Sequence, residues 1–473
     1  MMAKVSLGTL PTGIAGLDTL LNGGISAYSF NVITGAPGSG KTTLAHQMMF
    51  ALANPQRKAL YFTIIGEPPL KMLRYQQQYA FFDIDRVGSS IKYLNLADDL
   101  QSGRFEGVLD RILKEVEDFQ PELVFVDSFK SVVHAMAGGE KGLADLQNFI
   151  QRLGMYMASW QATTFLIGEY ADAGQEGNPI FTVADGVIHL LQETDQNAVV
   201  RKIRVVKMRG KSHMLGAHSF RITDHGLQVF PRQLSGGLAG DGDAAAPAPS
   251  VPPNRLSTGS DELDAMLGGG IPEGYSMLVL GPPGCGKTVL GTAFLAAGVR
   301  NGEVGMAASF EHILSVAANA PLERMIADGK VVAIRSQALD LSIEELVSEL
   351  VETARRTGAR RLLIDSLSAL ELSLAPQFRT NFQESLFRML SALHHMGVTV
   401  MMTRNVMDVS SNHLSPSAFL VDGVISMRYI ERDSRIIKAI ASPKLRGSWH
   451  SNQIRPYTVQ EDGITVSPTE LTP

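Results

Sequence analysis

The motif Gly-x-x-x-x-Gly-Lys-(Ser/Thr) occurs twice in this chain, at residues 35–42 and at residues 281–288. Each copy follows an apolar run, residues 30–34 or 277–280, and leads into a helical pattern, which is the context that the motif requires. Its glycines let backbone N–H groups surround phosphate oxygens, and the first turn of the helix adds a positive partial charge. Two copies, each between a strand and a helix, therefore predict a nucleotide-binding α/β fold.

Each position of the motif has a predicted role. The lysine reaches the β- and γ-phosphates, and the hydroxyl of the threonine that follows it is a ligand for Mg²⁺. The predicted nucleotide-binding residues are Gly35, Gly38, Ser39, Gly40, Lys41, Thr42 and Thr43 in the first copy, and Gly281, Gly284, Cys285, Gly286, Lys287, Thr288 and Val289 in the second.

The sequence around the two motifs is repeated as well. Residues 12–21 and 258–267 share the pattern Thr-Gly-x-x-x-Leu-Asp, at the same offset that separates the two motif lysines. Further pairs follow in the same order, residues 123–128 with 362–366 and residues 207–213 with 444–450. Repetition at a fixed order indicates a tandem duplication of one nucleotide-binding domain.

In both halves, apolar runs alternate with segments whose apolar residues recur at helical spacing, as in residues 108–116 and 343–351. This alternation predicts a mainly parallel sheet covered by helices on both faces, with phosphates bound at the carboxyl ends of the strands. Residues 235–253 are rich in Gly, Ala, Pro and Asp, which is typical of a flexible linker. We therefore expect domains at residues 1–234 and 254–473.

Composition argues against several classes of protein. The net charge of −5 does not favour nonspecific attraction to nucleic acid or to an anionic membrane. The first residues lack an apolar signal region, and no uninterrupted apolar run reaches membrane length. A single cysteine, Cys285, excludes an internal disulfide and fits a reducing compartment. We expect a cytoplasmic protein.

The lone cysteine and the histidines are interpreted as structural. Cys285 lies inside the second motif, where a small residue filling a permissive position is favoured over a thiol activated by the helix N-terminus. His46, His394 and His395 have no metal-ligand spacing with cysteines.

Two aspartates are candidates for the metal site. Asp127 and Asp365 each end an apolar run, where a carboxylate that organises Mg²⁺ is needed opposite the phosphate-binding loop. The alternative is an aspartate that caps a turn after a buried strand. A phosphate-binding motif in each half favours the metal-site interpretation.

Hydrolysis also needs a carboxylate that orients or deprotonates a water molecule. The candidates are Glu67 and Glu311, each after the strand that follows the motif's helix, and Glu169 is a weaker one near the same strand ends. The alternative for each is an exposed loop carboxylate.

Two basic residues recur late in each half, Lys207 and Arg209 in the first and Lys444 and Arg446 in the second. Charges at a solvated hairpin edge are the default interpretation. Their recurrence beside Gly and His instead suggests a catalytic cationic finger that reaches a phosphate, on a neighbouring subunit.

Taken together, the Thr-Gly-x-x-x-Leu-Asp leader, the Asp-Ser end of the later strand and the Lys-x-Arg-Gly-x-x-His segment resemble the KaiC family of RecA-like ATPases. The resemblance covers almost the whole chain outside the linker. It implies tandem RecA-like P-loop NTPase domains, ATP with Mg²⁺ as cofactor, and a homohexamer of two stacked rings with nucleotides between adjacent subunits. The late basic segment would then complete the neighbour's site through a heterologous contact that closes into a ring.

The resemblance also implies activities for each ring. In the family, the amino-terminal ring is a slow ATPase, and the carboxyl-terminal ring adds autokinase and autophosphatase activity. The family's paired catalytic glutamates are half present here, as Glu67 and Glu311. Ser415 matches the family's phosphoacceptor serine, Pro416 stands in place of the adjacent threonine, and Ser417 is a substitute acceptor.

The leading hypothesis is a hexameric, slowly hydrolysing ATPase with serine autokinase activity, which acts in signalling or timing with a KaiB-like or other signalling partner. One alternative is a nucleotide-gated scaffold with little hydrolysis, because each glutamate pair has lost a member. The other is a RecA-like DNA-dependent ATPase, against which stand the acidic charge and the lack of a basic, aromatic strand-binding loop. Neither nucleic acid nor a membrane is expected as a partner.

Overall fold

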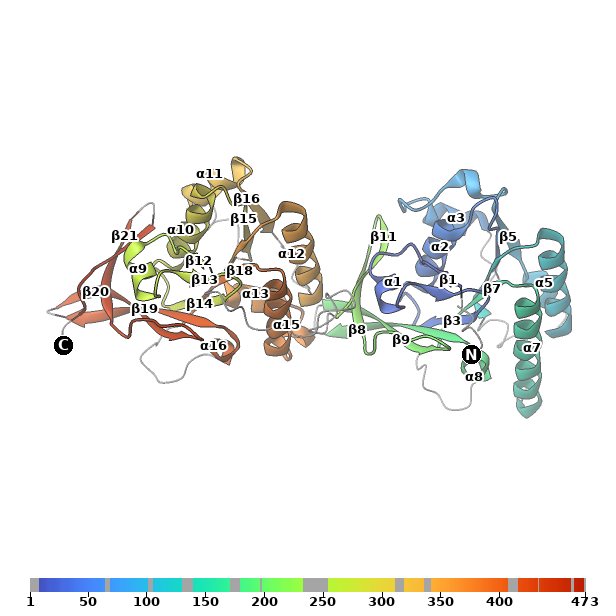
Figure 1. Ribbon diagram of the computed structural model, residues 1–473. Coiled ribbons are helices and arrows are strands. Elements are labelled where there is room, and N and C mark those ends of the chain that lie inside the picture. The colour runs from blue at the N-terminus through green and yellow to red at the C-terminus, as the bar shows by residue number, and fades with distance from the viewer. Residues whose placement is uncertain are drawn as a thin grey trace, which may run out of the picture. The chain divides into compact units, whose positions relative to one another are not determined.

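The computed structural model describes residues 8–63, 69–100, 105–129, 139–170, 179–195, 198–232, 254–310, 319–335, 342–406, 416–432, 434–460 and 463–471. Within them the chain forms two compact units, the first of which ends at Arg232 (Figure 1). The predicted linker, residues 235–253, lies outside the described residues, so its boundaries stay a prediction.

The first unit is built on a 9-stranded sheet in the order β11-β10-β9-β8-β3-β7-β6-β4-β5. The run from β5 to β8 is parallel, and β9 to β11 continue it as antiparallel strands. The strands of this sheet are β3 (Phe30–Gly35), β4 (Ala59–Thr63), β5 (Ile91–Asn95), β6 (Leu123–Asp127), β7 (Thr163–Gly168), β8 (Gly186–Asp195), β9 (Ala198–Met208), β10 (His218–Thr223) and β11 (Gly226–Phe230). Strands β1 (Thr9–Leu10) and β2 (Ile25–Ser26) pair with each other in a separate two-stranded sheet.

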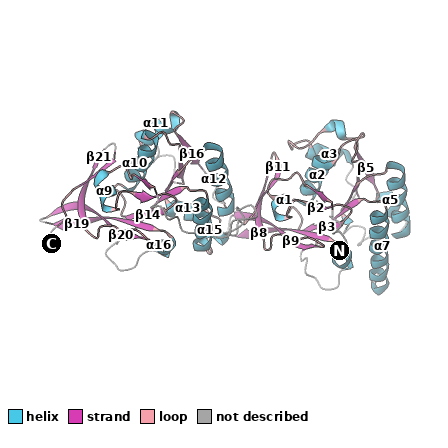
Figure 2. Cartoon of the chain, viewed as in Figure 1, coloured by secondary structure: helices cyan, strands magenta, loops and turns pink. Residues whose placement is uncertain are grey.

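Helices flank this sheet (Figure 2). They are α1 (Leu17–Leu20), α2 (Lys41–Leu52), α3 (Pro69–Gln76), α4 (Ala97–Leu100), α5 (Phe105–Phe119), α7 (Gly139–Ser159) and α8 (Pro179–Val183), with a 3₁₀ turn at Ile84–Arg86. Buried residues of α1 and α2 pack on one face of the sheet and those of α5 and α7 on the other. Burial on both faces explains why the central strands are continuous apolar runs.

The second unit repeats this sheet in the order β16-β15-β17-β18-β14-β19-β20-β21-β22, which is the same order read from the other edge. Its strands are β12 (Arg255–Leu256), β13 (Ile271–Pro272), β14 (Ser276–Gly281), β15 (Gly305–Ser309), β16 (Val331–Arg335), β17 (Arg361–Asp365), β18 (Thr399–Asn405), β19 (Gly423–Arg432), β20 (Arg435–Leu445), β21 (Arg455–Gln460) and β22 (Gly463–Val466). Its helices are α9 (Asp261–Met266), α10 (Lys287–Arg300), α11 (Ala320–Ala327), α12 (Ile343–Thr357), α13 (Leu367–Ser373), α14 (Pro376–Arg379), α15 (Phe382–His395) and α16 (Pro416–Leu420). The predicted fold, tandem P-loop domains with a mainly parallel sheet between helices, is confirmed.

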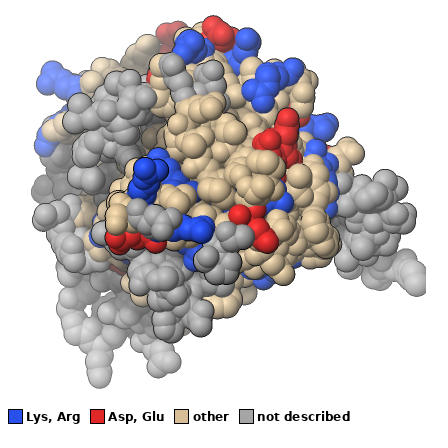
Figure 3. Space-filling view, turned by 90° about the vertical axis from the view of Figure 1, so that its left-hand side faces the viewer, with Lys and Arg blue, Asp and Glu red and all other residues tan. Residues whose placement is uncertain are grey.

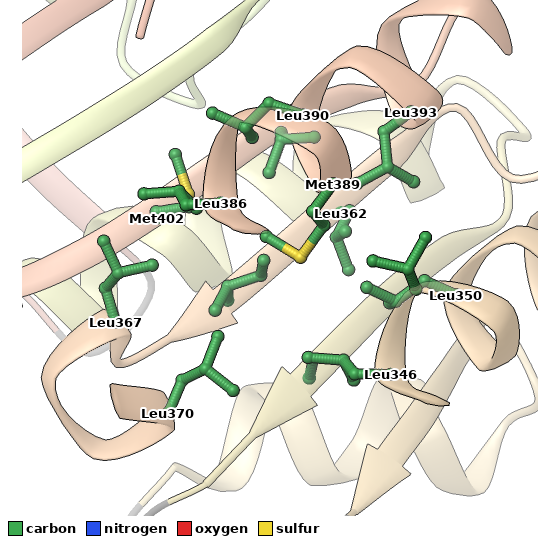
Figure 4. Close-up of a cluster of buried hydrophobic side chains, with 14 of the residues drawn as sticks. Leu346, Leu350, Leu362, Leu367, Leu370, Leu386, Met389, Leu390, Leu393 and Met402 are labelled. Atoms are coloured by element: carbon green, nitrogen blue, oxygen red, sulfur yellow. The ribbon is translucent and has the colours of Figure 1, made fainter. Parts of the chain in front are cut away.

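Leucine-rich packing holds the helices of the second unit to their sheet. Figure 4 shows side chains of α12, α13 and α15 converging on β17 and β18, among them Leu346, Leu370 and Leu386 around Leu362. Each of these four is fully buried, and burying a leucine contributes about 1.5–3 kcal/mol. The helical spacing of apolar residues in the sequence therefore marks the faces that pack.

The repeated Thr-Gly-x-x-x-Leu-Asp pattern forms a local lock before each phosphate-binding loop. Asp18 Oδ1 accepts hydrogen bonds from the backbone N–H and the hydroxyl of Thr12, both at 2.7 Å. In the second unit, Asp264 Oδ1 accepts the same pair from Thr258, at 2.7 and 2.6 Å. The leucine of each pattern is fully buried. The pattern thus fixes the segment of chain that precedes the first central strand.

Charged side chains of both signs are interspersed among uncharged ones on the face shown in Figure 3. None of the helices in the described ranges combines the length and the apolar character needed to span a bilayer.

Candidate nucleotide-binding sites

The two phosphate-binding loops connect the centre of each sheet to a helix. The first joins β3 to α2 and the second joins β14 to α10. The residue before each helix, Gly40 or Gly286, has a φ of 98° or 107°, which favours glycine. A Cβ at Gly40 would lie 2.7 Å from Ile222 Cδ1, and one at Gly286 would lie 2.8 Å from Val459 Cγ2. Both glycines are therefore required by backbone conformation and by close packing.

The motif lysines lie across their own loops. Lys41 Nζ donates to the Ala36 carbonyl at 2.8 Å, and Lys287 Nζ donates to the Pro282 carbonyl at 2.8 Å. Both side chains are buried. Each ammonium group is thus held against the inside of the loop, whose backbone amides are the predicted hydrogen-bond donors to phosphate.

The structure brings each motif threonine to its predicted partner aspartate. The Thr42 hydroxyl donates to Asp127 Oδ2 at 2.8 Å, and the Thr288 hydroxyl donates to Asp365 Oδ2 at 2.7 Å. The members of each pair are far apart in sequence, and they meet because β6 and β17 end at the same edge of the sheet as the loops. A hydroxyl and a carboxylate are the hard oxygen ligands that Mg²⁺ prefers, so the residues present fit the predicted metal.

A tyrosine that the sequence interpretation missed completes the surroundings of Asp127. The Tyr61 hydroxyl, from β4, donates to Asp127 Oδ2 at 2.8 Å. Burial raises the pKa of Asp127, whereas the hydrogen bonds from Tyr61 and Thr42 and the charge of Lys41 lower it. Burial, together with the charge of Asp127, also keeps the pKa of Tyr61 well above its usual range, so Tyr61 acts as a proton donor in this bond.

His46 supports the same site from α2. Its Nδ1 lies 2.8 Å from the Thr42 carbonyl. Burial lowers the pKa of His46 to about 4, so the ring is neutral at pH 7. Because a carbonyl only accepts, the proton is on Nδ1. His46 is therefore a structural histidine that fixes the first turn of α2.

In the second unit, Asp365 has a different additional donor. The Thr403 hydroxyl, from β18, donates to Asp365 Oδ1. Sequence reasoning missed Thr403 and Tyr61 alike, because each lies within an apolar strand and only the pairing of strands shows that it faces the carboxylate.

Cys285 is buried in the second loop, with its Sγ 3.9 Å from Lys287 Nζ. The hydroxyl of Tyr457 donates to the Cys285 carbonyl at 2.6 Å and so holds the loop backbone from β21. This arrangement fits the interpretation of Cys285 as a residue that fills a confined position.

The late basic residues contact the short helix that precedes the last parallel strand of their own unit. Lys207 Nζ donates to the Phe181 carbonyl at 3.0 Å and to the Thr182 carbonyl at 3.2 Å. Lys444 Nζ donates to the carbonyls of Ala418 and Val421, both at 2.7 Å. Desolvation, followed by the neighbouring arginine, lowers the pKa of each lysine. The two arginines are exposed and donate to carbonyls of the same helices, Arg209 to Thr182 and Arg446 to Phe419.

These basic residues lie far from the phosphate-binding loop of their own unit. The Arg209 N–H donates to the Asp185 carbonyl, and the Asp185 N–H donates to the carbonyl of Phe30, the first residue of β3. The loop follows the other end of β3, about 16 Å away at about 3.3 Å per residue. The second unit repeats this arrangement with Arg446, Asp422 and Ser276.

The remaining predicted site residues divide into two groups. Glu67, Glu311 and Ser415 lie outside the described residues. Glu169 follows β7, and its charge raises the pKa of Asp127, which places it near that carboxylate. Ser417 is fully buried in α16, and its hydroxyl accepts hydrogen bonds from Arg404 at 2.8 Å and from Gln383 at 3.5 Å. Phosphorylation of Ser417 would require α16 to open.

Comparison with known proteins agrees with this architecture. A family model described as the KaiC ATPase matches the chain twice, at residues 10–234 and 256–471. The circadian clock oscillator protein KaiC of Rippkaea orientalis is 26% identical over 470 residues, which cover 96% of this chain and 88% of that protein. The circadian clock protein KaiC3 of Synechocystis sp. is 26% identical over 474 residues, covering 97% and 91%. Since the family model matches most of the chain, and each matched region contains a phosphate-binding loop with its partner aspartate, the chain belongs to the KaiC family of ATPases.

Proposed function

We propose that this protein is a Mg²⁺-dependent ATPase with one ATP site in each unit, which assembles into a homohexamer of two stacked rings in the cytoplasm. The observation that carries the proposal is the duplicated set of a loop lysine, a threonine and an aspartate, with hydrogen bonds between threonine and aspartate at 2.8 and 2.7 Å. The names of the relatives, a circadian clock oscillator protein and a circadian clock protein, support a role in timing. A role in signalling and a KaiB-like or other signalling partner are further parts of this proposal.

The chain's own residues divide the work at each site. The loop amides and the lysine hold the β- and γ-phosphates, and the threonine–aspartate pair holds the metal. Mg²⁺, when bound, offsets the negative charge of the phosphate oxygens. Glu67 and Glu311 orient the attacking water, and hydrolysis is slow, as the resemblance to the family implies.

The position of the basic residues supports assembly into a ring. Lys207, Arg209, Lys444 and Arg446 lie at the edge of the sheet opposite their own loop, and the side chain of Arg209 is 57% exposed. Residues that cannot reach the site of their own unit are available to complete a neighbour's site. We infer that each basic segment contacts the nucleotide of the adjacent subunit, as a heterologous contact that closes into a ring.

We further propose serine autokinase activity in the second unit, with Ser415 as the acceptor and Glu311 as the general base. Ser417 is the substitute acceptor, and it becomes reactive only when its hydrogen bonds to Arg404 and Gln383 open. Incubation with γ-labelled ATP tests this activity. Label that is lost in Ser415→Ala and kept in Ser417→Ala supports Ser415, and an unlabelled wild type removes the kinase proposal.

Nucleotide binding and phosphate release test the ATPase. Lys41→Ala should lower nucleotide binding at the first site about 100-fold, Lys287→Ala should do so at the second, and the double variant should release no phosphate. Size-exclusion chromatography with and without Mg-ATP tests the ring, because a ligand bound between subunits stabilises their assembly. Binding that all three lysine variants retain would refute the assignment. Phosphate release that is equal in Glu67→Gln, Glu311→Gln and wild type would instead favour a nucleotide-gated scaffold.

A further inference from the structure

The two candidate metal carboxylates receive their hydrogen bonds differently. Asp127 Oδ2 accepts from both Thr42 and Tyr61, each at 2.8 Å. Asp365 accepts from Thr288 on Oδ2 and from Thr403 on Oδ1. Each carboxylate therefore has one hydroxyl from the phosphate-binding motif and one from a strand. The strand is β4 in the first unit and β18 in the second.

Strand register shows that the strand hydroxyl comes from a different strand position in each unit. Tyr61 pairs with Phe125, two residues before Asp127, and the matching residue of β15 is Ala307, which pairs with Leu363. The matching exchange involves β7 and β18. Ile167 pairs with Ile33 of β3, and Thr403 pairs with the corresponding Val279 of β14. The first unit has Tyr with Ile at these positions, and the second has Ala with Thr.

Packing leaves the Tyr61 hydroxyl a single direction. The side chain is fully buried, and its ring lies 4.4 Å from the ring of His46, 5.4 Å from that of Tyr93 and 5.8 Å from that of Phe125, centroid to centroid. A buried aromatic side chain that is enclosed in this way keeps its rotamer, so its hydroxyl stays on Asp127.

We propose that Tyr61 is a positioning residue of the first nucleotide site, which orients Asp127 toward the metal and takes the role that Thr403 has at the second site. This inference rests on the proposed function, since it assumes that Asp127 serves a Mg²⁺-bound nucleotide. Both described bonds at Asp127 end on Oδ2, so this oxygen is anchored and the orientation of Oδ1 is set by it.

The test uses the full chain with Lys287→Ala, so that only the first site binds a fluorescent ATP analogue. The readout is the Mg²⁺ concentration that gives half-maximal binding of the analogue, which does not depend on turnover. Tyr61→Phe removes the hydroxyl and keeps the ring. A hydrogen bond to a charged group is strong enough that we expect the required Mg²⁺ concentration to rise about tenfold.

Tyr93→Phe is the matched control. Tyr93 is a neighbouring buried tyrosine whose hydroxyl has no hydrogen-bond partner within the described part of the chain. We expect a change of less than about twofold for this variant, because no bond to the site is lost. If Tyr61→Phe and Tyr93→Phe shift the Mg²⁺ requirement equally, the positioning role is wrong.

The decisive variant gives the first unit the threonine hydroxyl that the second unit uses. Ile167→Thr in the Tyr61→Phe background places a hydroxyl where Thr403 has one and should restore most of the lost Mg²⁺ affinity. If the double variant requires as much Mg²⁺ as Tyr61→Phe alone, the inference that the two hydroxyls have the same role is wrong. In the Lys41→Ala background, Thr403→Val should weaken Mg²⁺-dependent binding at the second site, and an unchanged second site also counts against it.

These outcomes separate the inference from the function on which it rests. A wild-type chain that binds no nucleotide in the presence of Mg²⁺ refutes the proposed function. A wild-type chain that binds it, with Tyr61→Phe and Tyr93→Phe variants that require the same Mg²⁺ concentration, refutes only the positioning role of Tyr61.

Discussion

The two units share their sheet order and the geometry of their phosphate-binding loops, yet they differ in the side chains that pack beneath these loops. In the first unit, Tyr61, Tyr93 and Phe125 form an aromatic cluster with His46. The second unit has Ala, Ala and Leu at the strand positions that correspond to the two tyrosines and the phenylalanine. The loop, its lysine and the threonine–aspartate pair are the predicted ligand-binding residues, whereas the residues beneath them need only fill space and satisfy their hydrogen bonds.

A buried arginine shows the same contrast at the other end of the strands. Arg361, the first residue of β17, is 1% exposed and pairs with Glu303 at 2.6 Å. It also donates to the carbonyls of Ser257 and Phe294, at 2.7 and 3.0 Å. The corresponding first residue of β6 is Leu123, which is fully buried. One unit thus ties its leader segment, helix and sheet together with a charge, and the other fills the position with an apolar side chain.

The largest expected effect follows from this difference. Arg361→Ala leaves Glu303 without its partner and removes a donor from the carbonyls of Ser257 and Phe294, so the free energy of unfolding of the second unit should fall by about 3–5 kcal/mol. Leu123→Ala should cost the first unit about 2–5 kcal/mol through a cavity. The chain has two tryptophans, Trp160 in the first unit and Trp449 in the second. Denaturant unfolding followed with one of them replaced by Phe reports on each unit separately. A second unit whose stability is unchanged by Arg361→Ala contradicts the stabilising role of Arg361.

An intermediate effect concerns acid stability of the first unit. Burial, with a contribution from Arg232, lowers the pKa of His218 to about 4, and its Nδ1 accepts a hydrogen bond from the Arg232 N–H at 2.9 Å. The unfolded chain therefore binds a proton near pH 6.5, before the folded chain does. This contribution to stability is complete above pH 6.5 and is lost progressively as the pH falls toward 4, by up to about 2–3 kcal/mol.

The matched position in the second unit is Arg455, the first residue of β21, so the second unit has no histidine there. His218→Gln should make the stability of the first unit less dependent on pH between 6.5 and 4, as measured by unfolding with Trp160 as the reporter. If groups other than His218 cause the pH dependence, the stability of this variant should still fall between pH 6.5 and 4.

The smallest effect concerns the anchor of the second loop. Tyr457→Phe removes the hydrogen bond to the Cys285 carbonyl, which contributes about 1 kcal/mol, so nucleotide binding at the second site should weaken about fivefold. Phe220 stands at the matched position of β10, two residues before the one that packs on the loop glycine. Nucleotide binding measured in the Lys41→Ala background isolates the second site. An unchanged affinity means that the loop keeps its shape without the hydroxyl.

The sequence carried the parts of the site that are local or repeated. The loop glycines, Lys41 and Lys287 could be recognised because a phosphate requires those residue types at one fixed spacing on a strand–loop–helix unit. Asp127 and Asp365 could be recognised because a polar residue ends an apolar strand in both halves. The basic segments were found through repetition alone. They lie opposite the loop of their own unit, which explains why their spacing from that loop did not suggest a role.

Tyr61, Thr403 and Arg361 carried no such signal, since a tyrosine, a threonine or an arginine in or beside an apolar strand has many ordinary explanations. Their roles depend on which strands pair and in which register. By itself the sequence determined the duplicated fold and predicted the loops and their carboxylates, because the repeat, the spacing within each loop and the polar end of an apolar strand are all visible in the chain alone. Only the tertiary structure decided which hydroxyl reaches each carboxylate, because that contact joins strands that the sequence separates and the register of the sheet aligns.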